Sequence, residues 1–178
     1  FRRRLKFMKT SARLLMLITG VVILSVFAGP ATGSLAAPEA CTNPIFASLL
    51  ESLKSKTSVP LRLPLVVGGD YDAALYADVG WVGNARYVVR IGQQCERSYC
   101  PYGTVSGAKI SERAGRPAGK AVELSGGVTG YLADGSKTSK NSTITWDEEQ
   151  YRYSITIYAA EPSALVKVAN SALSCDNR

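Results

Sequence analysis

The spacing of apolar residues changes along the chain from an unbroken run to a helical period and then to alternation. An uncharged apolar run covers residues 14–28. Over residues 44–56 the apolar residues recur three or four positions apart, after Asn43 and Pro44, which favour a helix start. From residue 60 onward apolar and polar residues mostly alternate, which is typical of β-strands. The pattern therefore divides the chain into a leader, a short helical segment and a β-rich region.

Alternation and turn residues predict about six to seven strands in the β-rich region. The clearest hairpin joins residues 142–146 to residues 151–158 through the acidic cluster Asp147–Glu149. Residues 61–67 are predicted to form an edge strand, because Pro64 cannot donate a hydrogen bond to a neighbouring strand. The remaining strand candidates cover residues 73–81, 85–91, 102–111, 121–125 and 128–133, so the candidates slightly outnumber the strands expected.

The end of the chain again has a helical period, and a final helix is predicted to begin at Pro162. Strands enclosed by two helices, without an alternation of strand and helix, favour the α+β class. We expect a mainly antiparallel sheet of about six to seven strands, with an N-terminal and a C-terminal helix packed on it. The expected organisation is a signal peptide over residues 1–36, an N-terminal segment with a short helix over residues 37–59, and a β-rich domain closed by the C-terminal helix over residues 60–178.

Positive charge is concentrated at the start of the chain. The sequence has 21 lysine and arginine residues against 14 aspartate and glutamate residues, a net charge of +7. Without the first 36 residues the balance falls to 15 basic and 14 acidic groups, because six basic residues precede residue 14 and no acidic residue precedes Glu39. Binding of nucleic acid through bulk charge is therefore poorly supported, and we expect no nucleic-acid partner.

The leader is typical of a secretory signal peptide. A basic stretch precedes the apolar run of residues 14–28, and the small residues Ser34 and Ala36 follow it, which favours cleavage after Ala36. The alternative is an uncleaved membrane anchor, but the run is shorter than the ~20 residues needed to cross the hydrocarbon core. We expect a periplasmic or secreted protein that contacts a membrane only through the leader, if the leader is not cleaved.

The four cysteines all follow the predicted cleavage point. An even number of cysteines in an exported chain indicates disulfide bonds, and three pairings are possible. We favour Cys95–Cys100, which closes a local loop, and Cys41–Cys175, which joins the two ends. A structural metal site would need closely spaced cysteine pairs, which this spacing does not supply. We therefore expect no metal and no cofactor.

Candidate catalytic chemistry is sparse. The chain has no histidine, which excludes imidazole as a base, proton shuttle or metal ligand. A glycosidase would need two carboxylates that face each other across a cleft. The candidates for such a pair are Asp147, Glu148, Glu149, Asp70 and Asp72. Nothing in the sequence marks one of them as buried, so we assign no catalytic residue, and a carboxylate-based envelope hydrolase acting on polysaccharide is the alternative function.

A basic loop superficially suggests a phosphate-binding loop. It contains Arg113, Arg116 and Lys120, but it lacks the first glycine and the serine or threonine of that motif. A solvated basic loop is the simpler interpretation. The alternative is a weak site for an anionic ligand, such as an acidic polysaccharide or phosphate.

Several aromatic residues stand at strand positions and could line a groove. At that spacing aromatic side chains more often pack on a sheet. We expect such packing between the sheet and the final helix for Trp146, Tyr151 and Tyr153. The aromatic residues considered are Trp81, Tyr87, Trp146, Tyr151 and Tyr153.

The end of the chain carries a resemblance. Residues 144–155 read Ile-Thr-Trp-Asp-Glu-Glu-Gln-Tyr-Arg-Tyr-Ser-Ile, and residues 164–171 read Ala-Leu-Val-Lys-Val-Ala-Asn-Ser. This hairpin and helix resemble extracytoplasmic domains of anti-sigma-factor-like bacterial proteins. With Cys-Pro-Tyr-Gly-Thr-Val-Ser-Gly at residues 100–107 and Gly-Gly-Val-Thr-Gly-Tyr at residues 126–131, the chain is similar to uncharacterised secreted proteins of cyanobacteria. The resemblance implies a β-rich extracytoplasmic domain, with no known activity and no catalytic residues to transfer.

The leader, the cysteines and the lack of histidine favour one class of function. We expect an exported, disulfide-stabilised, non-catalytic domain with a binding or structural role in the periplasm or cell envelope. The expected partner is an unknown envelope component or a glycan. Buried, paired carboxylates would favour the hydrolase instead.

Overall fold

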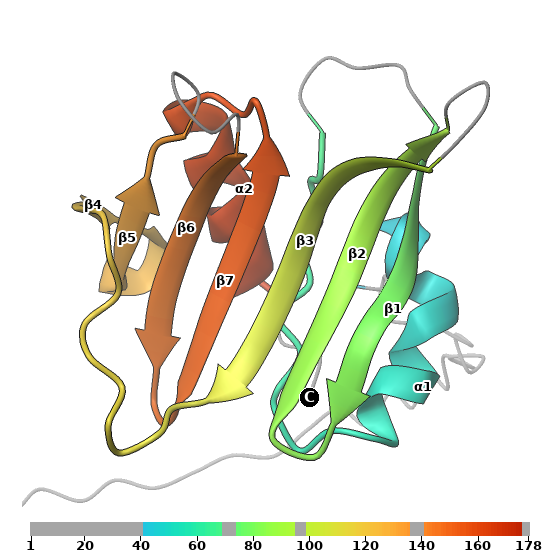
Figure 1. Ribbon diagram of the computed structural model, residues 1–178, viewed down its shortest axis with the longest axis horizontal. Coiled ribbons are helices and arrows are strands. Elements are labelled where there is room, and N and C mark those ends of the chain that lie inside the picture. Colours follow the sequence, from blue (N-terminus) through green and yellow to red (C-terminus); the bar gives the residue numbers. More distant parts are fainter. Residues whose placement is uncertain (1–40, 69–73, 95–98, 136–140, 176–178) are drawn as a thin grey trace, which may run out of the picture. The chain divides into compact units, whose positions relative to one another are not determined.

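The computed structural model describes residues 41–68, 74–94, 99–135 and 141–175. In this part of the chain seven strands form one antiparallel sheet with the order β1-β2-β3-β7-β6-β5-β4 (Figure 1). The α+β class and the antiparallel sheet are as expected from the sequence. The strands are β1 (Leu75–Gly83), β2 (Arg86–Gln94), β3 (Tyr99–Lys109), β4 (Lys120–Glu123), β5 (Thr129–Ala133), β6 (Asn141–Glu148) and β7 (Tyr151–Tyr158).

Helical segments stand at both ends of the described chain. Asn43 caps the first one, because its side-chain Oδ1 accepts a hydrogen bond from the Ile45 N–H at 3.1 Å. This segment begins as a 3-10 helix and continues as an α-helix that ends at Lys54, within the predicted residues 44–56. The final helix begins at Pro162, as predicted. The helices are η1 (Pro44–Leu49), α1 (Leu50–Lys54), η2 (Ser125–Gly127) and α2 (Pro162–Leu173).

One face of the sheet is covered, and it carries the core. Alternate residues of β2, β3, β6 and β7 are buried there, and they join buried residues of η1, α1 and α2 in one hydrophobic cluster. We call this the covered face; Figure 1 shows α2 behind β6 and β7 on this side. Its main members are Phe46, Leu53, Tyr87, Val89, Ile91, Val105, Ile144, Trp146, Tyr153, Ile155, Ile157, Leu165 and Val168.

Residues 61–67 do not form the predicted edge strand. The prediction rested on alternation, but the four adjacent residues 61–64 are all buried, whereas Leu65 and Val66 are both exposed, so buried and exposed positions do not alternate. Its backbone bonds to other parts of the molecule: the Asn43 N–H donates to the Pro64 carbonyl at 3.2 Å. The Arg62 N–H donates to the Tyr87 hydroxyl at 3.0 Å. The segment is irregular because single groups of other segments, rather than a neighbouring strand, form hydrogen bonds with its backbone.

The two ends of the described chain are joined covalently. Cys41 and Cys175 form a disulfide with a Cα–Cα distance of 5.3 Å across a sequence separation of 134 residues. This is the pairing favoured for the chain ends. Cys100 is also disulfide-bonded. Cys95, its favoured partner, and the leader lie outside the described residues.

Candidate functional site

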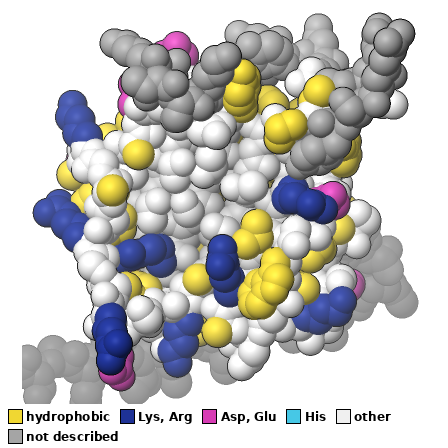
Figure 2. Space-filling view, in the orientation of Figure 1, with side chains coloured by type: hydrophobic (Ala, Val, Ile, Leu, Met, Phe, Trp, Pro, Cys, Tyr) yellow, Lys and Arg dark blue, Asp and Glu magenta, His cyan; other side chains and the backbone are white. Residues whose placement is uncertain are grey.

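The second face of the sheet, opposite the core, is the open face. It carries the strand residues that alternate with the buried ones. Figure 2 views the molecule from this side, and uncharged polar side chains and backbone, drawn in white, fill the middle of the view. Lysine and arginine side chains lie on both sides of this white area and below it. The open face therefore combines a polar, uncharged centre with cationic surroundings.

The strand register arranges the open face in rows that run across the strands. We call the middle one the central row: it takes one residue from each of β1, β2, β3, β7, β6 and β5. Aromatic residues stand at its two ends and hydroxyl side chains stand between them. In spatial order the central row is Trp81, Val88, Ser106, Ser154, Thr145 and Tyr131.

A β-bulge places Trp81 in this row. The register of β1 against β2 shifts between Val79 and Trp81, so that Gly80 is the extra residue. Without this shift, strict alternation would put Trp81 on the same face as Val79, toward the core. With it, Trp81 is paired with Val88 on the open face and is 52% exposed.

Hydroxyl groups in the middle of the open face bond to one another across the strands. The side-chain oxygens of Thr145 and Ser154 lie 3.0 Å apart, and those of Thr143 and Thr156 lie 2.9 Å apart. A hydroxyl has one donor and two acceptor positions, so each pair keeps unused hydrogen-bonding capacity. Because all four side chains are short and partly buried, they form a level polar surface.

An arginine lies over the aromatic ring at each end of the central row. The Arg86 Cζ atom is 6.0 Å from the centre of the Trp81 ring, and the Arg116 Cζ atom is 4.7 Å from the centre of the Tyr131 ring. Such stacking is a cation–π contact. In the described part of the chain neither guanidinium forms an ion pair with a carboxylate.

Two other arginines of the open face are paired with carboxylates. Arg90 donates two hydrogen bonds, at 2.8 and 3.0 Å, to the carboxylate of Asp78 on the next strand. Arg152 donates two, at 2.7 and 2.9 Å, to Asp147 in the same way. These fork-shaped contacts fix the side chains and neutralise their charges.

A hollow of about 450 Å³ opens beside the central row, within the size range of ligand pockets. Its polar lining includes the Arg90 guanidinium, the Asn141 amide and the Thr156 hydroxyl. Tyr102 and Tyr158 contribute aromatic surface, and Tyr158 is among the exposed large hydrophobic residues. The same two tyrosines also line a second hollow of about 590 Å³ between the end of β7 and α2.

The acidic cluster does not form a pair of facing carboxylates. Asp147 and Glu148 both belong to β6, and neighbouring residues of a strand point to opposite faces. Asp147 binds Arg152 on the open face, whereas Glu148 binds Arg62 on the covered side. Only Glu149 lies in the turn, with a φ of 55°. The prediction that the cluster Asp147–Glu149 connects the two strands is therefore wrong for Asp147 and Glu148, which belong to β6. Asp70 and Asp72 lie outside the described residues.

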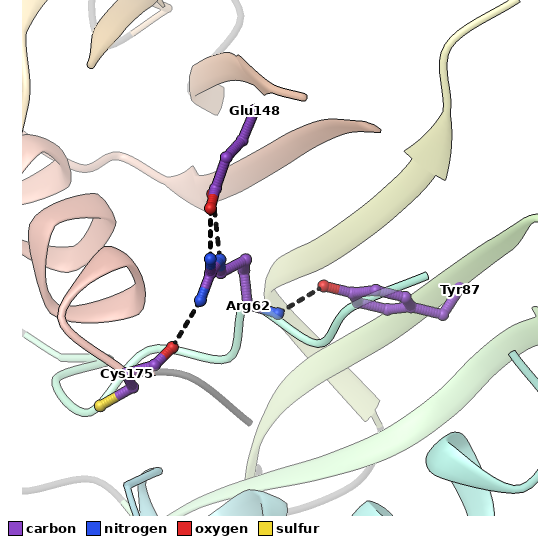
Figure 3. Close-up of polar contacts among 4 residues, drawn as sticks. All are labelled: Arg62, Tyr87, Glu148 and Cys175. Carbon is purple, nitrogen blue, oxygen red and sulfur yellow. Dashed lines mark hydrogen bonds and ion pairs between the residues drawn. The ribbon is translucent and has the colours of Figure 1, made fainter. Parts of the chain in front are cut away.

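Arg62 and Glu148 form a buried cluster with the C-terminal end of the chain (Figure 3). The Arg62 guanidinium donates to both Glu148 carboxylate oxygens, through Nε at 3.0 Å and through Nη2, and Nη1 donates to the Cys175 carbonyl at 2.9 Å. Arg62 is only 6% exposed. Burial also raises the pKa of Tyr87, whose hydroxyl accepts from the Arg62 backbone. The cluster joins three distant segments, so its role is architectural. No local pattern predicts it, because an arginine between two leucines in an alternating stretch suggests a solvent-facing position.

The predicted basic loop does not gather its three cations. Arg116 lies over Tyr131 on the open face. Lys120 is paired in the ladder with Leu132, a residue of the covered face, and paired residues share a face. Arg113 is exposed. Arg116 therefore contacts the open face, whereas Lys120 belongs to the covered side.

The aromatic residues are also divided between the two faces. Tyr87, Trp146 and Tyr153 are buried in the core, and Tyr151 packs against it. The Trp146 and Tyr153 rings stack with their centres 5.5 Å apart. This agrees with the expectation of packing for Trp146, Tyr151 and Tyr153, and it leaves Trp81 as the exposed member of the group.

Comparison with known proteins found no match: no family model, curated protein or solved structure corresponds to this chain. Among the residues that the structure describes, no group of three or more cysteine, aspartate or glutamate side chains could hold a metal ion. In the same residues no helix has the length and apolar character needed to span a membrane.

Proposed function

We propose that the protein is an exported, non-catalytic binding domain and that the open face of its sheet binds a glycan of the periplasm or cell envelope. The observation that carries this proposal is the central row, in which hydroxyl side chains from β3, β7 and β6 lie between the exposed Trp81 and the half-buried Tyr131. No helix or strand of the described chain packs on this row, and Arg116, from the loop between β3 and β4, covers Tyr131 at one end of it.

The residue types of the central row match the chemistry of a sugar. A sugar ring presents C–H groups on its faces and hydroxyl groups at its rim. The C–H groups are attracted to the negative face of an aromatic ring, such as that of Trp81 or Tyr131. The rim hydroxyls both donate and accept, which suits the spare capacity of the Thr145 and Ser154 hydroxyls.

The neighbouring hollow supports the same ligand class. Its polar lining residues are Arg90, Asn141 and Thr156; the Arg90 guanidinium is held by Asp78 and the Thr156 hydroxyl by Thr143. Tyr102 and Tyr158 supply the apolar part of the lining. A site with a few directed polar groups on aromatic and apolar surface is the usual form of a small-molecule pocket.

A binding role is favoured over hydrolysis because two of the candidate acidic residues, Asp147 and Glu148, are held in ion pairs on different faces of the sheet. Asp147 is held by Arg152 and Glu148 by Arg62, on opposite faces of the sheet. A glycosidase needs two carboxyl groups about 5–10 Å apart on either side of one glycosidic bond. The disulfide Cys41–Cys175 supports export, since disulfides persist in oxidising compartments.

The proposal is tested by calorimetric titration of the purified protein with cellohexaose, chitohexaose and hexagalacturonate. The informative variant is Thr145→Val combined with Ser154→Ala, which removes a bonded pair of hydroxyls and leaves no unpaired partner. We expect at least one hexasaccharide to bind, and the double variant to weaken that binding about ten-fold with little change in melting temperature.

The matched control is Ser52→Ala, which removes a hydroxyl from α1, outside the sheet. We expect it to bind like the wild type. If no hexasaccharide binds, or if the double variant binds as well as the control, the open face is not a glycan site.

A further inference from the structure

We infer that the ligand of the open face is a linear acidic polysaccharide whose negative groups contact Arg86 at one end of the central row and Arg116 at the other. This inference rests on the proposed glycan-binding function and specifies the class of glycan. It follows from which charges on the open face are already neutralised and from the separation of those that are not.

The carboxylates of the open face do not reach Arg86 or Arg116. Asp78 is bound by Arg90 and Asp147 by Arg152. The register also places Glu123 on this face, at the outer strand β4, and it forms no ion pair with another described residue. The open face therefore carries four arginines and three carboxylates. Arg86 and Arg116 form no ion pair with a described carboxylate, so their charges are available to a ligand.

Stacking on an aromatic ring prepares each of these arginines to bind a carboxylate. A guanidinium that lies over a ring uses its flat face for this contact. Its N–H groups lie in the guanidinium plane and stay available for the two oxygens of a carboxylate. At each end of the central row the ring therefore holds the guanidinium in place, and the N–H groups at its edge are the part that an acidic group of the ligand can reach.

The distance between the two ends of the central row favours a polymer over a small anion as the ligand. Trp81 and Tyr131 are separated by five strand-to-strand steps. At about 4.8 Å per step the row is roughly 24 Å long. A single phosphate or monosaccharide cannot contact both arginines, whereas a chain of several acidic sugars can, and simultaneous contact at two points strengthens binding.

The distribution of charge favours an acidic glycan over a nucleic acid. Binding to a phosphate backbone depends on many cations in a row. Here the centre of the row consists of serine and threonine hydroxyls, and the chain after residue 36 has only one more basic than acidic group. The two free arginines suit widely spaced carboxylates better than a phosphate at every step.

The experiment compares hexagalacturonate with its methyl ester, which keeps the backbone but has no charge, and with digalacturonate, which is too short to span the row. Binding is measured by calorimetry at low salt for the wild type, Arg86→Gln, Arg116→Gln and the control Lys56→Gln, whose lysine follows α1. We expect hexagalacturonate to bind at least about ten-fold more tightly than the other two ligands. Each arginine variant should lose about five-fold for hexagalacturonate and almost nothing for the ester, and Lys56→Gln should lose nothing.

The outcomes separate this inference from the proposed function. Equal binding of the acid and the ester overturns the inference and keeps the glycan site. Equal binding of digalacturonate and hexagalacturonate overturns contact at both ends. Absence of binding by every saccharide overturns both proposals. Tighter binding of a thymidine hexanucleotide than of hexagalacturonate would show that the surface binds phosphate polymers.

Discussion

The two faces of the sheet contain the same kinds of residue in different surroundings. The covered face has Trp146, fully buried, and the Arg62–Glu148 ion pair. The open face has Trp81, half exposed, and the Arg152–Asp147 ion pair. Asp147 and Glu148 are adjacent in β6, so a step of one residue separates the two environments.

Exposure to water, rather than residue type, decides how much each of these contacts contributes to the free energy of unfolding. An exposed ion pair contributes about 0–1 kcal/mol, because water and salt screen it. Removing one member of a buried pair leaves an uncompensated charge and costs about 3–5 kcal/mol. Residues of the covered face should therefore control stability, and those of the open face should control binding.

The largest effect is expected from the disulfide on the covered side. Replacing Cys41 and Cys175 with serine removes a link across 134 residues, which the loop-entropy model values at about 5 kcal/mol. We expect urea unfolding to show a loss of that order. A loss below about 1 kcal/mol would mean that the buried contacts alone hold the ends together.

The two tryptophans provide the next comparison. Trp146→Ala should lower the free energy of unfolding by about 3–5 kcal/mol, because it removes a fully buried indole. Trp81→Ala should cost less, about 1–2 kcal/mol, since only about half of its surface is buried. Thermal melting of both variants tests this, and an unchanged melting temperature for Trp146→Ala would contradict the packing described here.

The adjacent residues Asp147 and Glu148 test the difference in stability between the two ion pairs. Glu148→Gln should cost about 3 kcal/mol, because it leaves the Arg62 charge buried without its counter-charge. Asp147→Asn should cost less than about 1 kcal/mol. Urea unfolding of the two single variants gives both values; equal losses would show that the two ion pairs lie in equivalent environments.

Alkaline pH should lower the free energy of unfolding through the buried tyrosines of the covered face. Burial raises the pKa of Tyr87 and Tyr153 above the ordinary value of 10.0, so both keep their protons in the folded state while the unfolded chain releases them. Their contribution to stability is complete below pH 10 and declines as pH rises above it, by about 1.4 kcal/mol per pH unit for one tyrosine.

The test is urea unfolding between pH 9 and pH 11.5 for the wild type and for Tyr87→Phe. The variant should be less stable at neutral pH, because the Arg62 N–H loses its acceptor, and less sensitive to alkali. Parallel stability curves for the two proteins would mean that Tyr87 does not titrate on unfolding.

The sequence by itself determined the elements whose signals are local. Alternation is uninterrupted in residues 151–158, so β7 and its partner β6 are predicted within one or two residues. Asn43 and Pro44 place the start of the first helix, and Pro162 places that of the last. The spacing of the cysteines, together with their even number, pointed to Cys41–Cys175. For the hairpin and the helix starts the deciding interactions lie within a few residues, whereas the cysteine count leaves three pairings possible and the structure shows the favoured bond between the ends.

Tertiary structure alone decided the two features that matter most for the candidate site. The face occupied by Trp81 depends on the bulge at Gly80, because one extra residue reverses the alternation of the strand. The environment of Arg62 depends on Glu148, which is 86 residues away, and on the Cys175 carbonyl. Periodicity reports only which residues share a face; whether that face meets water, a helix or a ligand is set by packing between distant segments.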